Sequence, residues 1–519
     1  MGSVEVESCI EILHDHFGEI VASLGRILLT ESASLPVVVF RANKKLKLPQ
    51  IRRALVILEQ HNIVKFVLKE NRIVYSIEPV DVLRLVRSTR CSLIAKKLYG
   101  QMAEAIVEEL LYQGRLTCSD CIRRVATRLE APLNEIKTQF ARLCETQMIM
   151  RCENVVNTLD GCPIMEKAVD PFLMPHVILD GKDESSPSAS TDTRKRKLAE
   201  EKPDSDASIY WRLNWLRFER YMRDEFVVEA ACSDREGFEN NVKTLRALLK
   251  ISELKADSKA ASSYPISIHD VVRTVNANQV NMEKKEIEVS LRMLSDDESG
   301  IVRKVGDSAG GLYIVDFEKA ITLQCQWNLE SVAREKIDSR AVRIIRLLLQ
   351  KGYLSEEQIE KYAMLSSKET KELCYALLDH HLISIRHVPK TQDFAPARTF
   401  YLYHVELCQI AQGLYLESCR VLRNVIIRRR HQTKQNKALI DRHLKMETIL
   451  ANIEADANLD EASKRQQMLE VENMYMTAAD RTNLEQYRRS QLALFKAEIE
   501  LDKSILICSL FIEFARRRL

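Results

Sequence analysis

The residues most suggestive of site chemistry are the two cysteines of a Cys-x-x-Cys motif, Cys118 and Cys121. A pair at this spacing can supply half of a zinc site or the two thiols of a redox centre. The next cysteines, Cys144 and Cys152, do not form a second close pair, and no strand-helix-strand pattern surrounds the motif. We therefore interpret Cys118 and Cys121 as packing residues at a predicted helix start, and we expect neither a metal nor a cofactor.

Motifs of common catalytic sites are missing from the sequence. It contains no GxxxxGK[ST] phosphate loop, no HExxH zinc helix, no GxSxG nucleophile elbow and no GxGxxG dinucleotide loop. His14 and His16 lie two residues apart on a predicted helix, so their side chains point in different directions. We expect a protein that is not an enzyme and has no catalytic residue.

Pairs of arginines are the stronger functional candidates. Arg52 and Arg53 lie together in one predicted helix, and Arg123 and Arg124 lie together in another. Such side chains can contact DNA phosphates without reading the base sequence. No set of side chains suited to reading bases accompanies them, so any DNA contact should be independent of sequence.

A denser basic cluster lies near the C-terminus. The segment Arg420–Lys445 holds nine Lys or Arg residues and one acid, and it includes Arg428, Arg429 and Arg430. A solvated helix face would explain this pattern. An acidic partner or nucleic-acid phosphate would explain it equally well.

A polar stretch of the chain contains a short basic run and is followed by two tryptophans. Residues 180–208 are rich in Ser and charge and predict a disordered linker. Trp211 and Trp215 follow it at helical spacing, and core packing is favoured over a role as partner-binding anchors. The linker also contains a candidate nuclear localisation signal, or alternatively a solvated charge run, formed by Arg194, Lys195, Arg196 and Lys197.

The length and composition of the chain indicate the kind of fold that positions these residues. The chain has 519 residues, a net charge of +3, only 14 Gly and 12 Pro, and 13 scattered Cys. The low Gly and Pro content favours a mostly helical multidomain protein, and the small net charge excludes a global attraction to nucleic acid. Scattered cysteines are typical of a reducing compartment, the cytosol or nucleus. The apolar run 504–512 is too short to span a bilayer, so no membrane contact is expected.

A repeat of three helices followed by two strands recurs four times. This pattern predicts four tandem winged-helix domains, with a helical solenoid as the alternative. In each copy two apolar residues one turn apart on the third helix should face the core: Leu55 and Leu58, Phe140 and Leu143, Leu291 and Leu294, Tyr375 and Leu378. Second helices begin with capping pairs: Thr117 and Asp120, Ser267 and Asp270, Ser355 and Gln358.

The predicted boundaries divide the whole chain. The fold class is mainly α with small β-wings, ending in an antiparallel two-helix coiled coil whose turn is expected at 456–460. The first two winged helices are 1–92 and 93–179, followed by the linker. The remaining parts are a third winged helix with flanking helices at 209–328, a fourth at 329–404, and the coiled-coil hairpin at 405–519.

The order of these parts resembles a known family, the third-largest subunit of DNA-directed RNA polymerase III. The motifs that carry the resemblance are Phe17-Gly-Glu-Ile-Val21, Ile106-Val-Glu-Glu-Leu-Leu111, Val388-Pro-Lys390 and Pro396-Ala-Arg-Thr-Phe-Tyr-Leu402. The resemblance covers essentially the whole chain.

This resemblance implies a noncatalytic nuclear subunit. It would join a polymerase-specific heterotrimer on the clamp of the largest subunit, be similar in role to TFIIE, and support promoter opening and initiation. Its partners would be other RNA polymerase III subunits and single- or double-stranded DNA bound without sequence specificity. By the same likeness the extended fourth wing reaches toward the DNA cleft, with Lys390 and Arg398 as its candidate DNA-facing charges.

Two other functions remain open from sequence. Winged helices also bind partners in signalosome or ubiquitin-pathway scaffolds, although those chains normally place a long helical solenoid before a single wing. A free-standing DNA-binding repressor is the weaker third hypothesis.

Overall fold

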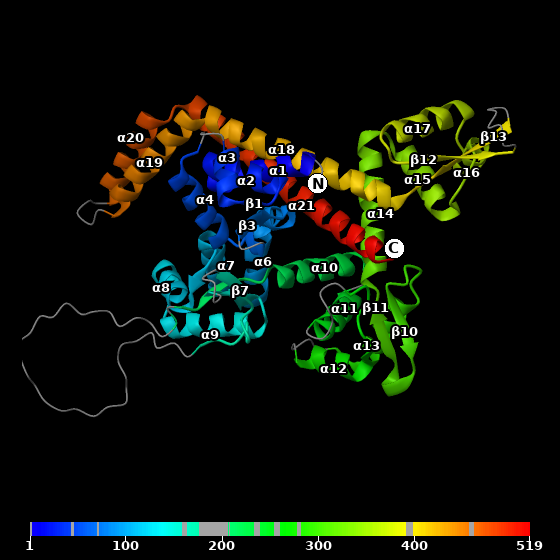
Figure 1. The fold of residues 1–519 in the computed structure, drawn as a ribbon, viewed down its shortest axis with the longest axis horizontal. Helices are drawn as coiled ribbons and strands as arrows, with labels where there is room; N and C mark the ends of the chain where they lie inside the picture. The colour runs from blue at the N-terminus through cyan, green and yellow to red at the C-terminus, as the bar shows by residue number, and fades with distance from the viewer. Residues whose placement is uncertain are drawn as a thin grey trace, which may run out of the picture. The chain divides into compact units, whose positions relative to one another are not determined.

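The computed structural model describes most of the chain in two compact units (Figure 1). Unit 1 comprises residues 1–213 and 419–502, and unit 2 comprises residues 214–418 and 503–519. The described residues are 3–42, 46–69, 72–157, 163–175, 206, 208–232, 239–253, 260–277, 282–390, 398–455 and 461–518. Across these ranges the chain is mainly helical with small antiparallel sheets, which confirms the prediction of a mainly α protein with small β-wings.

Module 1 of unit 1 is a helical group closed by a three-stranded sheet of order β1-β3-β2. Its helix α4 buries one face, which includes Leu55 and Leu58 as predicted. Its elements are α1 (Ser3–Phe17), α2 (Glu19–Thr30), β1 (Ala33–Ser34), α3 (Leu35–Arg41), α4 (Leu48–Gln60), β2 (Val64–Lys69) and β3 (Arg72–Ile77).

Module 2 repeats this plan and packs on module 1. Gln60 of α4 donates from Nε2 to the Gln113 carbonyl at 2.7 Å, and the predicted cap is present, since the Asp120 amide donates to Thr117 Oγ1 at 3.2 Å. The elements are α5 (Pro79–Leu83), η1 (Arg84–Arg87), α6 (Ser88–Tyr99), α7 (Gln101–Gln113), β4 (Leu116–Thr117), α8 (Cys118–Leu129), α9 (Leu133–Glu145), β5 (Ile149–Arg151), β6 (Asn154–Asn157) and β7 (Pro163–Glu166).

The sheet of module 2 corrects a predicted boundary. Strand β8 (Tyr210–Leu213) lies between β4 and β5, so residues 210–213 complete module 2 and do not begin the third domain at 209. Of the expected linker 180–208, only Asp206 and Ser208 fall among the described residues. The Asp206 carboxylate is buried and accepts hydrogen bonds from Ser119, at 2.9 Å from the amide and 2.6 Å from Oγ. This contact fixes the chain at α8 just before it enters the sheet.

Module 3 lies in unit 2 and contains the sheet β10-β11-β9. Leu291 and Leu294 are buried, and the Asp270 amide donates to Ser267 Oγ at 3.3 Å, both as predicted. The elements are α10 (Trp215–Ala231), α11 (Glu239–Ser252), β9 (Ile266–Ser267), α12 (Ile268–Ala277), α13 (Lys284–Ser295), β10 (Val302–Gly306), η2 (Ser308–Gly310), β11 (Leu312–Val315) and α14 (Phe317–Lys336).

Module 4 carries the long hairpin of strands β12 and β13. Its cap is present, since Gln358 Oε1 accepts from the Ser355 amide at 3.0 Å. The expected core pair on its third helix is wrong, because Leu373, Cys374 and Leu377 are buried there whereas Tyr375 is exposed and Leu378 half-buried. The elements are α15 (Ser339–Lys351), α16 (Glu356–Ala363), α17 (Ser367–Asp379), β12 (Ser384–Pro389) and β13 (Thr399–His404).

The C-terminal helices form a hairpin whose arms run antiparallel within unit 1. Thr433 Oγ1 lies 3.1 Å from Tyr487 Oη, and Arg442 pairs with Asp480 at 3.2 Å. Each arm is divided into two helices, which differs from the uninterrupted pair that was expected; the predicted turn at 456–460 lies outside the described residues. The helices are α18 (Leu407–Gln435), α19 (Lys437–Ala455), α20 (Glu461–Tyr475) and α21 (Ala478–Arg518).

Candidate nucleic-acid and subunit interface

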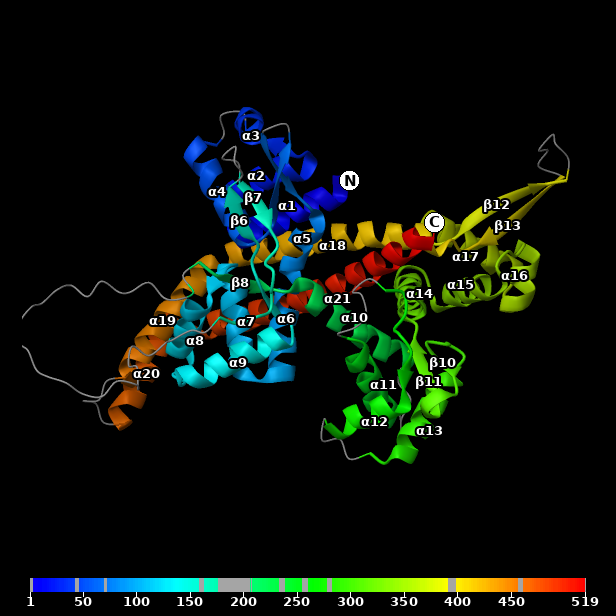
Figure 2. The same cartoon turned by 60° about the horizontal axis from the view of Figure 1, so that its bottom comes forward.

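The β12–β13 hairpin extends beyond the helices of its own module (Figure 2). Val388 pairs with Phe400 in the ladder, and the Lys390 amide donates to the Arg398 carbonyl at 2.8 Å. Because side chains alternate along a strand, Arg386, Val388, Lys390 and Phe400 share one face of this two-stranded ribbon. Lys390 Nζ lies 4.6 Å from the centre of the Phe400 ring, and Phe400 is 52% exposed. The hairpin thus presents cationic and aromatic groups together.

The base of the hairpin is held by contacts to the loop before α16. Leu354 and Tyr403 exchange backbone hydrogen bonds of 3.1 and 2.8 Å, and Tyr403 is buried. The neighbouring Tyr353 accepts a hydrogen bond from Arg386 at 3.2 Å, and its ring lies 4.9 Å from that of His404. On the opposite face, His387 and Tyr401 stack edge to face. These contacts give the ribbon a defined direction relative to module 4.

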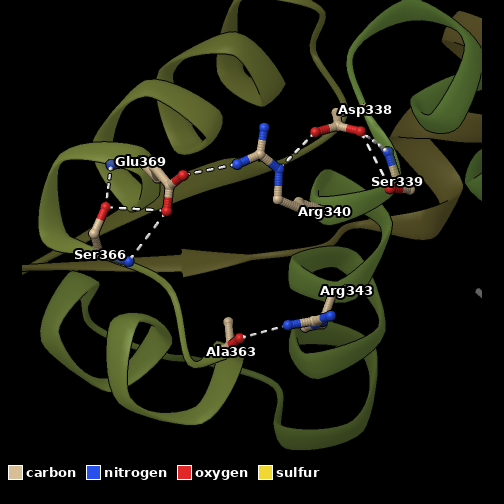
Figure 3. Close-up of polar contacts among 7 residues, drawn as sticks. All are labelled: Asp338, Ser339, Arg340, Arg343, Ala363, Ser366 and Glu369. Carbon is tan, nitrogen blue, oxygen red and sulfur yellow. Dashed lines mark hydrogen bonds and ion pairs between the residues drawn. The ribbon is translucent and has the colours of Figure 1, made fainter.

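A polar network holds together the helices that carry the hairpin (Figure 3). Arg340 of α15 lies between two carboxylates, 2.6 Å from Asp338 and 2.8 Å from Glu369 of α17. Glu369 also completes the capping box of α17 with Ser366. The hydrogen bond from Arg340 and that from the Ser339 amide lower the pKa of Asp338. No sequence reasoning identified this network, because its members are 29 residues apart and only the fold brings them together.

The candidate DNA-facing residues at the hairpin tip are partly within the described range. Lys390 and Arg398 are both exposed, and each lies at an end of the strand pair. Residues 391–397 between them lie outside the described residues. The ladder therefore brings together two of the predicted charges.

The other predicted phosphate contacts are spread over unit 1. Arg52 and Arg53 are exposed on α4, the third helix of module 1. Arg123 and Arg124 are exposed on α8, where Arg123 lies 4.0 Å from Asp120. The first pair belongs to module 1 and the second to module 2.

The arginine cluster on α18 is engaged within the molecule. Arg429 lies 2.5 Å from Asp15 of α1 and 2.7 Å from Glu498 of α21. Arg430 contacts Glu11 and lies 2.6 Å from His14 Nδ1. Arg429 and Arg430 therefore bind carboxylates of their own chain. Of the three partner-binding candidates on α18, only Arg428 is exposed.

Sequence spacing contains the signal for that contact. The acids of α1 recur every four residues, which places them on one helix face. Each acid meets an arginine of α18, and Arg423 adds a third pair at 2.9 Å, although the three arginines are not evenly spaced. The acidic stripe consists of Glu7, Glu11 and Asp15.

The tryptophan candidates differ in placement. Trp211 is fully buried in the sheet of module 2, and its ring meets the edge of Phe140 at 5.4 Å. A side chain with no exposed surface cannot anchor a partner, so the partner-binding role of Trp211 is wrong and the core-packing alternative is correct. Trp215 is half-buried at the start of α10.

The Cys-x-x-Cys motif is also in the core of module 2. Cys118 and Cys121 are both fully buried, and burial raises the pKa of Cys118 to about 12, so this thiol stays protonated. In the described part of the chain, no group of three or more His, Cys, Asp or Glu side chains could hold a metal ion. The candidate localisation residues Arg194–Lys197 lie outside the described residues.

None of the described helices is both long enough and apolar enough to cross a membrane.

Three family models match the chain in the order of its modules. One, described as the RNA polymerase III subunit RPC82 helix-turn-helix domain, matches residues 7–69, and one for RNA polymerase III subunit RPC82 matches residues 164–323. The third, described as the POLR3C C-terminal winged-helix domain, matches residues 329–405. The helices and small sheets of modules 1 and 4 therefore define a protein of the winged-helix class.

Curated relatives match over the full length. The chain is 34% identical to the rat DNA-directed RNA polymerase III subunit RPC3 and 33% identical to the human one, with 100% of each chain covered. It is 31% identical to the zebrafish protein of the same name, over 99% of both chains. The chain belongs to the RPC3 family of DNA-directed RNA polymerase III subunits. This membership favours the polymerase-subunit hypothesis over the scaffold and repressor alternatives.

Proposed function

We propose that the chain is a noncatalytic subunit of RNA polymerase III that acts in the nucleus. In this proposal it joins two other subunits in a heterotrimer on the clamp and supports promoter opening during initiation. Full-length similarity to RPC3 proteins supports the assignment to the polymerase. The absence of catalytic motifs from the sequence is in accord with a supporting role.

The observation that carries a role in DNA contact is the exposed ribbon of module 4. Lys390 and Arg398 supply positive charge at the tip, and the exposed Phe400 ring supplies a surface on which a base can stack. Cations track the phosphate backbone and aromatic rings tolerate any base, so this combination suits single-stranded or opened DNA without sequence preference.

Promoter opening by the reconstituted polymerase tests this role. The variant K390A/R398A/F400A should assemble normally and show at least tenfold less permanganate reactivity of the opened bases. Binding to premelted DNA should have a log–log salt slope reduced by about 2, one for each lost cation. The matched control K361A/K368A removes two exposed lysines from α16 and α17 and should leave both measurements unchanged. Equal opening by the triple variant and the control would refute DNA contact by the hairpin.

A further inference from the structure

The outward face of α4 exposes apolar side chains next to basic ones. The helix directs Ile51 and Leu58 into module 1, while Val56 on its other side is 62% exposed and Ile57 is also exposed. One turn earlier along the same face lie Arg52 and Arg53. The surface therefore combines two β-branched side chains with two guanidinium groups.

The charge of this surface is uncompensated within the described part of the chain. Arg52 and Arg53 are both exposed, and no ion pair between described residues includes either of them. The single acid of α4, Glu59, lies 2.5 Å from Arg115 of module 2 and so belongs to the contact between modules. The only carboxylate of α4 is therefore engaged by module 2, which leaves Arg52 and Arg53 as the exposed charges beside Val56 and Ile57.

An exposed apolar pair is not a requirement of the module. On α9 of module 2, Ala141 and Arg142 take the places of Val56 and Ile57, whereas α13 of module 3 also exposes two apolar residues, Val289 and Met293. Exposing Val56 and Ile57 to water has an unfavourable hydration cost that a covering partner would remove. What distinguishes α4 from α9 and α13 is that two adjacent arginines accompany its exposed apolar pair.

The side chains favour a protein occupant over duplex DNA. Hydrogen-bond donors and acceptors read base edges in the major groove, and on this surface only Arg52 and Arg53 supply donors, whereas Val56 and Ile57 supply none. A helix that lies on such a surface needs apolar residues at i, i+3 or i+4, and i+7, and carboxylates beside them complement the arginines. We propose that the outward face of α4 binds an acidic amphipathic helix of another protein, with Val56 and Ile57 as the apolar contact and Arg52 and Arg53 as the charge contact.

A binding titration on the full chain tests this proposal. The probe is a fluorescein-labelled, 18-residue designed helix with leucines at i, i+4 and i+7 and glutamates at the flanking positions. V56D and R52E/R53E should each raise its Kd at least tenfold, whereas T138D on α9 should leave the Kd within twofold. A peptide with lysines in place of the glutamates should bind at least tenfold more weakly than the acidic probe.

Three outcomes would overturn the proposal. The first is equal affinity for the acidic and basic peptides, and the second is an unchanged Kd for V56D. The third is displacement of the acidic probe by a 20-base-pair duplex whose own binding V56D abolishes, which would make this face a DNA surface. Melting curves of V56D and T138D would show whether either change alters folding.

A photocrosslink keeps the test independent of any folding defect. With a benzophenone side chain at position 56 in the assembled polymerase, the crosslinked peptide should come from another protein and carry Asp or Glu beside helically spaced apolar residues. A crosslink to nucleic acid, or to a segment without such acids, would contradict the proposal. Because this site and the β12–β13 hairpin share no residue, failure of this test would leave the evidence for the proposed DNA contact unaffected.

Discussion

Replacing Asp502 by alanine tests how strongly α21 is fixed to the segment before α6 in unit 1. Asp502 Oδ1 lies 2.8 Å from Arg87 Nε, and both side chains are only 3% exposed. Removing one partner of a buried ion pair costs about 3–5 kcal/mol, because the remaining charge stays desolvated. Unit 1 spans roughly 300 residues, for which an unfolding entropy of about 2.1 cal/mol/K per residue gives roughly 1.6 °C per kcal/mol. Calorimetry should therefore show a Tm about 5–8 °C lower for D502A.

Two further variants isolate the reason for that loss. Glu485 and Arg489 form an exposed pair on the same helix, so E485A should cost less than about 1 kcal/mol. The double variant R87M/D502L should recover much of the lost stability, because apolar side chains can replace a buried pair at little net cost. A Tm for D502A equal to that of E485A would refute the assignment of a large energetic role to burial of this pair.

Three other substitutions have defined outcomes. Gly114→Ala should lower the Tm more than Gly100→Ala, because both positions have positive φ but only at 114 would the new Cβ lie 2.5 Å from a backbone oxygen of module 1; equal losses would contradict this steric reasoning. Burial lowers the pKa of His61 from its usual 6.5 to about 4, so the folded state resists protonation of this ring. The neutral His61 therefore contributes stability above pH 6.5 that is lost as the pH falls toward 4. His61→Phe should flatten the loss of Tm between pH 6.5 and 4.5, and an unchanged slope would refute the assignment. Arg340→Gln should lower the Tm at low salt by removing the contact to Glu369, and the difference should shrink at high salt, because exposed pairs are screened; a difference independent of salt would exclude the electrostatic cause.

Local patterns in the sequence predicted the helical modules well. The caps at Thr117, Ser267 and Ser355 were recognisable because a capping pair involves residues only three positions apart. Core positions on the third helices were also recognisable from their spacing, except in α17. There the periodicity alone did not distinguish Tyr375 from Leu373, because both register choices place apolar residues on one face.

Long-range contacts set the limit of prediction from sequence. Strand β8 is only four residues long and pairs with strands about 60 and 95 residues earlier, so Trp211 looked like part of a helix with Trp215. The arginine cluster of α18 was recognised from its composition. Its partners Glu11 and Asp15 could not be assigned, because they lie more than 400 residues away in the chain.

The pairing of α1 with α18 has a consequence for biosynthesis. Residues 1–213 leave the ribosome long before residue 502, the last one that unit 1 requires. At about 5–20 residues per second, the ribosome needs roughly 15–60 s to translate the intervening stretch. During that interval the acidic face of α1 and the apolar surface beside it are exposed to solvent. We therefore expect the nascent chain to depend on chaperones, and we expect truncated products to be degraded.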